Sequence, residues 1–409
     1  MMRILYINHY AGSLSLGMEF RPFLISREWK KMGHDVKIIA SVFSHLRQVN
    51  PKVDRDLEIT TENGITYQWI RTPQYHGNGI LRFINILVFV VKLFLYRNRI
   101  CCDFVPDIVI ASSTYPLDVL VGYFISKKYK AKLVHEVHDL WPLTLLELGK
   151  FKKWHPLIVA FQFAENFSCR NAHRVVSMLE NTFSYLQEKG LSRDRFVYVP
   201  NGIVKEDFGN SKSAPPQEMI SLCEDLKQKG FFIFGYAGAI GVANAMEFVL
   251  EAMKQLRNEK IALVLVGKGE KKLGLSKFAE EEKLENVYFF DSIPKSQVAD
   301  FLGTVDAAYI GWHARPIYRF GINPNKILDY MMAGRPIFHS VTAGNDWVLE
   351  AKAGISVPAE NVDAIAHGLR EMSQLPSSKL QEMGENGKNF VKANHLYENL
   401  AKRFLRGLY

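Results

Sequence analysis

Short β-rich runs alternate with helical patterns along almost the whole chain, and this alternation restricts the possible folds more than any other feature. In the first half the runs are RILYIN, VKIIAS, DIVIAS, KLVHEV, RVVSM and FVYVPNG, separated by helical patterns such as EFRPFLISREWKKMG. The second half continues with FFIFGYAG, IALVLVGKG, VYFFD, AAYIGW and PIFHS. Alternating strands and helices form parallel sheets covered by helices, so the sequence predicts a doubly wound α/β protein.

One break in this alternation divides the chain. The segment NGIVKEDFGNSKSAPPQE is rich in Gly, Asn, Ser and Pro, which favour loops. A chain of 409 residues is also too long for a single hydrophobic core. We therefore expect a Rossmann-like domain over 1–204, a linker over 205–228, a second Rossmann-like domain over 229–388, and a final helical segment over 389–409.

Charge and cysteine usage narrow the class of protein. The 51 basic and 42 acidic residues give a net charge of +9, which suits nucleic acid, anionic lipid or phosphorylated substrates. The basic residues are dispersed and form no aromatic–basic platform, which argues against nucleic acid. The four cysteines lack CxxC spacing, so we expect reduced thiols rather than a metal site. The N-terminus MMRILYINHY reads as a buried strand rather than a signal peptide, which predicts a cytoplasmic protein.

The most hydrophobic window, ILRFINILVFVVKLFLY, is too short and too often interrupted for a membrane span of about 20 residues. At about 100° per residue its polar side chains fall within one arc of a helix. These polar residues are Arg82, Asn85, Lys92, Tyr96 and Arg99. The wide apolar face suits a helix lying in a membrane interface, and it also suits a helix buried between a sheet and its neighbours. Both alternatives stay open.

The segment INPNKILDYMMAGRP predicts a helix that begins in a polar and cationic environment. Asn323 is a good N-cap, and Pro324 fits the first helical position. Lys326 then lies in the first turn, where the helix dipole prefers an anion, so an anion such as phosphate is expected from outside the chain. The alternative is a capped surface helix in which Lys326 and Asp329 pair.

Two glycine turns follow strands of the second half. In YAGAIG, Gly238 and Gly241 allow backbone amides to approach a phosphate. In VGKGEKK the turn carries Lys268, Lys271 and Lys272, whose alternative interpretation is a solvated lysine cluster. Ligands of parallel sheets bind beyond the carboxyl ends of the strands, so these turns and INPNK together predict an anion site.

The segment HEVHDLWP places His135, Glu136, His138 and Asp139 close together in sequence. Alternation along a strand points these side chains to different sides, so we expect no metal there. The DRD segment at 54–56 reads as a solvated turn rather than a magnesium site. The motifs GxSxG, GxxxxGK[ST] and HExxH are absent, which argues against serine hydrolases, P-loop NTPases and zincins.

Taken together, these segments resemble the retaining, family-four (GT4) glycosyltransferases of the two-Rossmann GT-B fold. The resemblance spans nearly the whole chain and rests on GMEFRPFLISREWKKMGHDVKIIAS, VHDLWP, VPNGI, YAGAIG, VGKGE and PNKILDYMMAGRPI. The residues of these segments are most similar to those of the bacterial O-antigen and capsule branch, including enzymes similar to N-acetylfucosamine transferases. The resemblance implies two facing domains, with the helix over 389–409 returning to the first. It also implies sugar transfer from a nucleotide diphosphate sugar, first of all a UDP-sugar, with no metal or other cofactor.

The resemblance also implies roles for individual residues. The catalytic set would be His138, which faces the transferred sugar, Lys326, which faces the diphosphate, and Asp329, which grips the ribose. The donor-binding set would be Gly238, Ala239, Gly241, Lys268, Ile293, Ile322, Asn323, Asn325, Lys326 and Asp329, with the base against Ile293. Gly321 stands where the family has an acidic residue, so the amides of Ile322 and Asn323 would take over part of the sugar recognition. Ala239 also departs from the family pattern and removes a polar contact from the phosphate loop.

The acceptor would bind the first domain along 8–22, at Gly17, Glu19 and Arg21, although Glu19 and Arg21 also suit helix capping and a surface salt bridge. The resembled branch suggests a polyprenyl-diphosphate-linked saccharide as acceptor. The protein would then be peripheral on the inner face of the cytoplasmic membrane, and KFKKWH with Trp154 suits that interface. The alternatives are a GT-B nucleotide-sugar epimerase and a catalytically silent membrane-associated binding protein.

Overall fold

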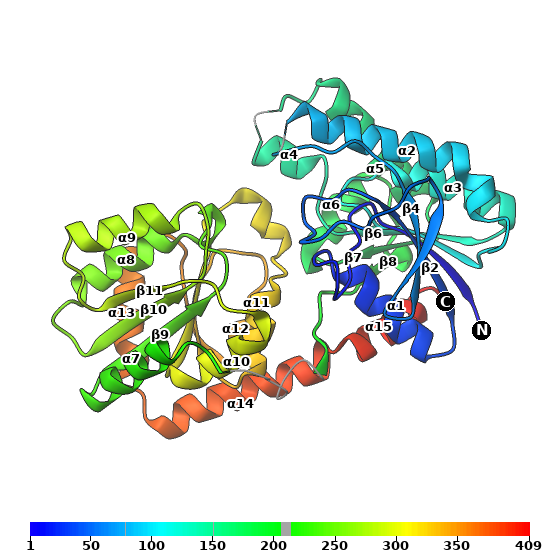
Figure 1. Ribbon diagram of the computed structural model, residues 1–409. Helices are drawn as coiled ribbons and strands as arrows, with labels where there is room; N and C mark the ends of the chain where they lie inside the picture. The colour runs from blue at the N-terminus through cyan, green and yellow to red at the C-terminus, as the bar shows by residue number, and fades with distance from the viewer. Residues whose placement is uncertain (78, 150, 206–213) are drawn as a thin grey trace. The chain divides into compact units, whose positions relative to one another are not determined.

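The computed structural model describes residues 1–409 except 78, 150 and 206–213, and it contains two compact units (Figure 1). The first unit comprises Met1–Asn201 and Tyr397–Tyr409, and the second comprises Gly202–Leu396. Each unit is built on its own largely parallel sheet flanked by helices. The expectation of two α/β domains with parallel sheets is therefore confirmed.

In the described part of the first unit, the sheet has the strand order β3-β4-β2-β1-β5-β6-β7-β8. Neighbouring strands run parallel except for β3 and β4, which form an antiparallel pair. The strand bounds are β1 (Arg3–Ile7), β2 (Asp35–Ser41), β3 (Glu58–Glu62), β4 (Ile65–Ile70), β5 (Ile108–Ala111), β6 (Lys132–Val137), β7 (Arg174–Ser177) and β8 (Phe196–Tyr198). The central strands are buried on both faces, as expected for a sheet covered by helices.

Helices cover both faces of this sheet. Their bounds are α1 (Arg21–Lys31), α2 (Ile80–Ile100), α3 (Asp118–Tyr129), α4 (Leu143–Glu147), α5 (Pro156–Asn171), α6 (Phe183–Glu188) and α15 (Tyr397–Arg406), with short 3-10 turns η1 (Glu180–Thr182) and η2 (Arg193–Arg195). Figure 1 shows α1 and α15 on one side of the sheet and α2 and α3 on the other. The indole nitrogen of Trp29 donates a 3.1 Å hydrogen bond to the carbonyl of Ala401, which fixes α15 against α1.

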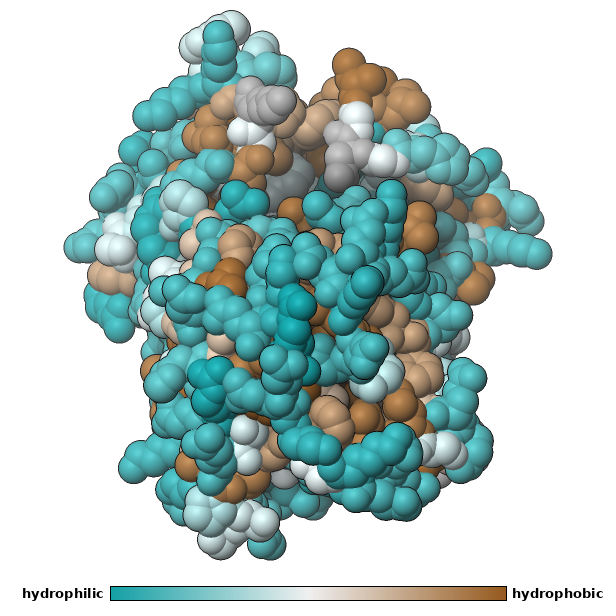
Figure 2. Space-filling view, turned by 90° about the vertical axis from the view of Figure 1, so that its left-hand side faces the viewer, coloured by the Kyte–Doolittle hydropathy of each residue, from teal (hydrophilic) through white to brown (hydrophobic). Residues whose placement is uncertain are grey.

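The sheet of the second unit has the order β11-β10-β9-β12-β13-β14, with every described pair parallel. This is the Rossmann order 3-2-1-4-5-6 when β9 is counted as the first strand. The bounds are β9 (Phe232–Ala237), β10 (Ile261–Val266), β11 (Val287–Phe290), β12 (Ala307–Gly311), β13 (Ile337–Ser340) and β14 (Gly354–Val357). The side of this unit drawn in Figure 2 is mostly hydrophilic, with hydrophobic residues in small separate areas.

The helices of the second unit enclose two hydrophobic cores, one on each face of the sheet. One core involves α8 (Met246–Gln255), α9 (Lys272–Glu281) and α13 (Val362–Ser373). The other involves α7 (Gln217–Gln228), α10 (Lys295–Thr304), α11 (Asn325–Met332), α12 (Trp347–Glu350) and α14 (Ser377–Asn394). The described part of this unit also contains the short 3-10 turns η4 (Val242–Asn244) and η5 (Pro316–Phe320).

Two details differ from the sequence analysis. Helix α7 occupies the end of the range assigned to a linker, because Met219, Cys223 and Leu226 give it an apolar side that packs on the second sheet. Residues 206–213 of that range lie outside the described residues. The predicted helical segment over 389–409 is two helices, since α14 ends at Asn394 in the second unit and only α15 belongs to the first.

Each sheet has a topological switch point, where successive strands begin to be added on the other side of the first strand. It lies between β1 and β5 in the first unit and between β9 and β12 in the second. The loops at the carboxyl ends of these strands diverge and leave room for a ligand. The candidate residues of both units lie on or near these loops.

Candidate functional site

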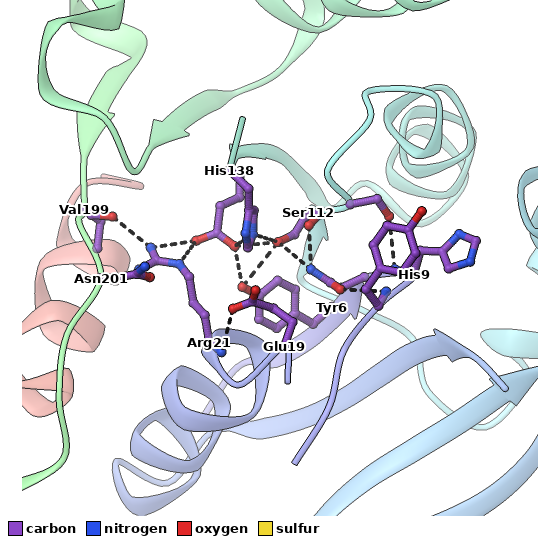
Figure 3. A network of polar contacts seen from close by, with 12 residues as sticks. Tyr6, His9, Glu19, Arg21, Ser112, His138, Val199 and Asn201 are labelled. Carbon is purple, nitrogen blue, oxygen red and sulfur yellow. Dashed lines mark hydrogen bonds and ion pairs between the residues drawn. The ribbon is translucent and has the colours of Figure 1, made fainter. Parts of the chain in front are cut away.

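The first unit holds a buried polar network at the carboxyl ends of β1, β5 and β6 (Figure 3). Glu136, the second-last residue of β6, is its centre. One carboxylate oxygen accepts hydrogen bonds from Arg21 Nε at 2.9 Å and Nη2 at 2.8 Å. The other accepts from the Tyr6 hydroxyl and from Ser112 Oγ at 2.6 Å. Burial alone raises the pKa of Glu136, but the Arg21 guanidinium and the hydrogen bonds from His138 and Ser112 bring that pKa well below its ordinary value.

His138 lies at the accessible edge of this network, just beyond β6. Its Nε2 is 2.7 Å from Ser112 Oγ and 3.3 Å from a carboxylate oxygen of Glu136. Its side chain is 11% exposed, whereas that of Glu136 is fully buried. The contacts with Ser112 and with the Glu136 carboxylate fix the orientation of the imidazole ring. The network can therefore present His138 in one orientation at the end of the first sheet.

Arg21 has a different role from the predicted contact with an acceptor. Its guanidinium is 1% exposed, and besides Glu136 it donates to the carbonyls of Pro200 at 2.6 Å and Val199 at 2.9 Å. The side chain thus joins the start of α1 to β6 and to the segment that follows β8. A guanidinium enclosed in this way has no accessible face for an acceptor, so the assignment of Arg21 to acceptor binding is corrected to a structural one.

The other predicted acceptor residues lie in the same loop. Glu19 Oε1 accepts a 3.3 Å hydrogen bond from the amide of Arg21, so it caps the first turn of α1, and its side chain stays partly accessible. Gly17 is buried with φ +97°, and a Cβ there would lie 2.8 Å from the amide nitrogen of Gln48. Gly17 is therefore required by loop geometry, and of this set Glu19 alone keeps an accessible charged group.

The second unit contains a pocket of about 650 Å³ beyond the carboxyl ends of β9, β10 and β11. Four predicted donor-binding residues line it, namely Gly238, Ala239, Lys268 and Ile293. The other lining residues are Ala237, Val266, Gly267, Gly269, Ser292, Lys295 and Val298. The pocket combines glycine-rich backbone, two lysines and an apolar wall, which is the composition expected for a ligand with an anionic and a planar apolar part.

Lys326 lies directly behind the glycine turn of this pocket. Its Nζ donates to the Tyr236 hydroxyl and lies 4.1 Å from the centre of the Tyr236 ring, and that hydroxyl donates to the carbonyl of Ala239. A Cβ at Gly238 would lie 2.6 Å from Lys326 Cε, so the turn needs a glycine to admit the lysine. Burial lowers the pKa of Lys326 from 10.5 to about 7, and nearby Asp329 offsets part of this effect.

Helix α11 begins one residue later than the sequence predicted. Pro324 is extended, with ψ 125°, so it is the N-cap, and Asn325 rather than Pro324 is the first helical residue. Lys326 is therefore in the first turn, as expected. Asp329 Oδ1 lies 3.6 Å from Nζ of Lys295, which connects α11 with the start of α10 at the pocket wall.

The remaining predicted donor residues do not line this pocket. The amide of Ile322 donates to Asn345 Oδ1 at 2.7 Å, and Asn345 Nδ2 donates back to the Ile322 carbonyl at 3.0 Å. The Ile322 amide, which the sequence analysis assigns to sugar recognition, is thus bonded to Asn345 in this structure. Gly241 precedes η4, and a Cβ there would meet no atom within 4 Å, so no close approach explains this glycine. Asn323 and Asn325 flank Pro324 at the start of α11.

Sequence reasoning missed several residues of these two sites. Tyr6 in β1 and Ser112 just after β5 contact Glu136, and no sequence spacing relates them to it. Tyr236 lies in YAGAIG, where no local pattern indicates that its hydroxyl contacts Lys326. Lys295 had a usable signal, because it is a second lysine at a helix start, in DSIPK, like Lys326 in INPNK. Of the three lysines after β10, Lys268 alone lines the pocket, and Lys272 pairs with Asp291 at 2.6 Å.

In the part of the chain that the structure describes, no three His, Cys, Asp or Glu side chains form a group that can hold a metal ion. His135 is buried, with its Nδ1 2.8 Å from Ser168 Oγ, so it points away from His138's partners. The four cysteines are free thiols.

Family models match both units. Residues 17–202 match the model described as glycosyl transferase 4-like domain, and residues 224–390 match the model described as glycosyl transferases group 1. The chain is 23% identical over 389 residues to the probable glycosyltransferase WbjE of Pseudomonas aeruginosa, covering 93% of this chain and 92% of the other. It is 25% identical over 258 residues to WcaI of Escherichia coli, a putative colanic acid biosynthesis glycosyl transferase, covering 59% of each chain.

Solved structures share the fold of the whole chain. Sucrose-phosphate synthase from Thermosynechococcus elongatus has a TM-score of 0.70 at 16% identity, covering 99% of this chain and 98% of that one. HepE of Anabaena, solved in complex with UDP and glucose, has a TM-score of 0.65 at 14% identity, covering 99% of both chains. These likenesses confirm the expected GT-B architecture.

Proposed function

The chain is a glycosyltransferase with the GT-B fold, and from this premise we propose that it transfers a sugar from a UDP-sugar to a polyprenyl-diphosphate-linked saccharide. The observation that carries the proposal is the second-unit pocket, where a glycine turn, Lys268 and Lys326 gather at the carboxyl ends of the strands. UDP is favoured as the nucleotide because HepE, of the same fold, was solved with UDP. Surface polysaccharide synthesis is favoured because WcaI is described as a putative colanic acid biosynthesis glycosyl transferase. We propose O-antigen or capsule as the polysaccharide that this chain helps to build.

The proposed reaction retains the configuration of the transferred sugar. The bond between the anomeric carbon and the diphosphate breaks, and the acceptor oxygen bonds to that carbon on the same face. The acceptor's proton passes to the departing phosphate oxygen, so no protein nucleophile is needed. Lys326, Lys268 and the amides of the turn at Gly238 stabilise the charge on the departing diphosphate, so the proposed reaction uses neither a metal ion nor another cofactor.

The apolar wall of the pocket receives the base in this proposal. Ile293 and Val298 flank the pocket at the end of β11 and the start of α10, which places apolar side chains beside the lysines. Asp329 is the proposed partner of the ribose hydroxyls, and it can exchange its contact with Lys295 for them. His138 in the first unit is the proposed hydrogen-bonding partner of the transferred sugar, with Glu136 as the group that orients it.

The test is thermal unfolding of the purified protein with UDP-, GDP- and CDP-linked sugars and with ATP, repeated for Lys326→Ala and Asp329→Ala. We expect stabilisation by UDP-sugars that both variants lose. Lys277→Ala is the matched control, because this exposed lysine on α9 pairs with Glu281 at 3.5 Å and does not line the pocket. Stabilisation by another nucleotide would overturn the UDP assignment, and no stabilisation by any nucleotide would overturn the donor site.

Product analysis with the stabilising donor and a polyprenyl-linked acceptor then tests the transfer. Formation of an elongated lipid-linked saccharide, with the anomeric configuration of the donor, is the expected result. Release of free sugar or of an epimer in place of transfer would indicate a nucleotide-sugar epimerase of the same fold.

A further inference from the structure

Helix α2 has the reverse of the usual orientation of a surface helix, because its polar side faces inward. Asn85 is fully buried, and its Nδ2 donates to Thr72 Oγ1 at 2.7 Å and to the carbonyl of Pro73 at 2.6 Å. Lys92 Nζ and the Tyr96 hydroxyl bind the carboxylate of Asp56 at 2.9 and 3.2 Å. The arc of the helix that a soluble protein normally turns to water is thus occupied by contacts within the unit.

The outward side of α2 is an uninterrupted apolar stripe. At about 100° per residue, six side chains fall within one arc of roughly 100°, opposite the buried side. They are Ile80, Ile84, Leu87, Val91, Phe94 and Leu95, each between 37% and 74% exposed. Ile86, Phe89 and Leu93 fill the buried side, so the core is complete without the stripe. Neither alternative of the sequence analysis holds alone, since the helix is buried on one side and exposes apolar residues on the other.

The stripe continues across two neighbouring helices through a string of aromatic rings. The ring of Phe94 lies 5.5 Å from that of Phe124 on α3, whose neighbour Tyr123 lies 5.0 Å from Phe167 on α5. Phe167 in turn is 6.3 Å from Phe163, which is exposed together with Val159 on α5. Just before α5, Trp154 is also exposed. We call the surface formed by the stripe, Phe124, Val159, Phe163 and Trp154 the apolar face. An exposed apolar surface of this extent marks a site that a membrane or another molecule covers.

The charges on these helices are of one sign. Asp118 and Glu165 are the acidic residues of α2, α3 and α5, and both are buried. The exposed charges of the three helices are basic and lie at the helix ends, at Arg99, Lys127, Lys128 and Arg170, and Lys152 and Lys153 are exposed beside Trp154. Lys150, which belongs to the same basic segment, lies outside the described residues. The apolar face is therefore bordered by cations and carries no exposed carboxylate on its three helices.

This charge pattern distinguishes between the two partners that could cover the apolar face, a second copy of the chain and an anionic membrane. A second copy of the chain would place its lysines and arginines opposite the same cations, which is unfavourable. An anionic bilayer satisfies both features at once, because its headgroups neutralise the cations and its acyl boundary receives the apolar side chains. In the described residues, no helix is long and apolar enough to cross a membrane. We propose that α2, α3 and α5 dock in the plane of an anionic membrane through the apolar face.

The inference deepens the proposed function and rests on it for its purpose, since a polyprenyl-linked acceptor is held in such a membrane. The docking itself depends on the first unit, whereas the nucleotide pocket lies in the second. The two proposals can therefore fail separately. A protein that binds nucleotide and not vesicles would refute docking alone, and one that binds vesicles and not nucleotide would refute the donor site alone.

The test is flotation of the full-length protein with vesicles of equal parts phosphatidylcholine and phosphatidylglycerol, and with phosphatidylcholine vesicles. We expect the protein to float with the anionic vesicles, less so in high salt, and to stay in solution with the neutral ones. The double variant Leu87→Glu, Leu95→Glu should lower partitioning roughly tenfold or more, because it puts two carboxylates into the stripe. Leu273→Glu is the matched control, since this leucine of α9 is 83% exposed but belongs to the second unit.

Three results would overturn the inference. One is a protein that stays in solution with anionic vesicles, and another is a double variant that floats as well as the unchanged protein. The third is a dimer in solution that the double variant dissociates, which would assign the face to a second copy. Because both leucines are exposed, the double variant should keep the folded state, and an unchanged circular dichroism spectrum and thermal unfolding midpoint without nucleotide verify this.

Discussion

We predict that Lys326 couples donor binding to proton uptake. In the free protein its ammonium is packed against the Tyr236 ring, and burial lowers its pKa to about 7. A bound diphosphate supplies the negative charge that this site lacks, so it raises the pKa of Lys326 toward the ordinary 10.5. The direction of the pH effect on donor affinity follows from this rise in the pKa of Lys326. Because the donor complex binds more protons than the free protein, donor affinity falls as the pH rises through 7.

The size of the effect follows from the free-protein pKa. At a pH equal to that pKa, about half of the lysine side chains are neutral, and at pH 8 about nine tenths are neutral. Donor binding should therefore take up about 0.5 proton at pH 7 and about 0.9 proton at pH 8. Above pH 7 each pH unit costs about 1.4 kcal/mol, so the affinity should fall about tenfold per unit while the lysine remains charged in the complex.

Titration calorimetry in two buffers of different ionisation enthalpy measures this proton uptake. The ligand should be the intact nucleotide diphosphate sugar, whose diphosphate carries no group that titrates near neutral pH. Lys326→Arg is the matched control, because an arginine stays charged and should bind with no proton uptake. Lys326→Met should bind weakly at every pH. Uptake near zero in the unchanged protein, with affinity constant from pH 7 to 8, would refute the reasoning.

Two further predictions concern packing. Glu136→Gln leaves the Arg21 guanidinium buried without its carboxylate, and we expect a loss of about 3–5 kcal/mol in the unfolding free energy of the first unit, measured by urea titration. The same change at Glu259, in a half-exposed ion pair of the second unit, should cost below about 1 kcal/mol, and equal losses at the two sites would contradict this account. Gly238→Ala should weaken donor binding, measured by calorimetry, because the new methyl group would lie 2.6 Å from Lys326 Cε. Unchanged affinity would mean that the lysine position is not critical.

The sheets could be predicted well where strands are fully buried. The eleven β-rich runs correspond to β1, β2, β5 to β13 and so include the centres of both sheets. The runs that form β3, β4 and β14 were missed, because these strands lie at or near the sheet edges and have mixed patterns. In β3 every residue is at least partly exposed, so its sequence, EITTE, lacks the continuous apolar run of a central strand.

The candidate site was predictable where the chemistry is local in sequence. Glycine turns and helix starts are short patterns, so Gly238, Lys268 and Lys326 could be found, and the structure brings them to one side of the second unit. Burial is a long-range property and was not predictable. Arg21 follows a polar loop and therefore resembles a binding residue in the sequence. Glu136 and Val199, which are far from Arg21 in the sequence, enclose its side chain in the structure.

Helix α2 illustrates why the same pattern can support opposite interpretations. Its sequence determines that polar and apolar arcs exist, but it does not determine which arc meets the sheet. The hydrogen-bond acceptors beneath α2 determine which arc faces the sheet. Asp56 and the carbonyls of Arg71 and Pro73 supply acceptors on the inner side for Lys92 Nζ and Asn85 Nδ2, so the stripe faces outward. An apolar stripe in water costs free energy in proportion to its exposed area, and this cost is removed only when another body covers it. The polar contacts beneath α2 are thus what orients the helix for membrane docking.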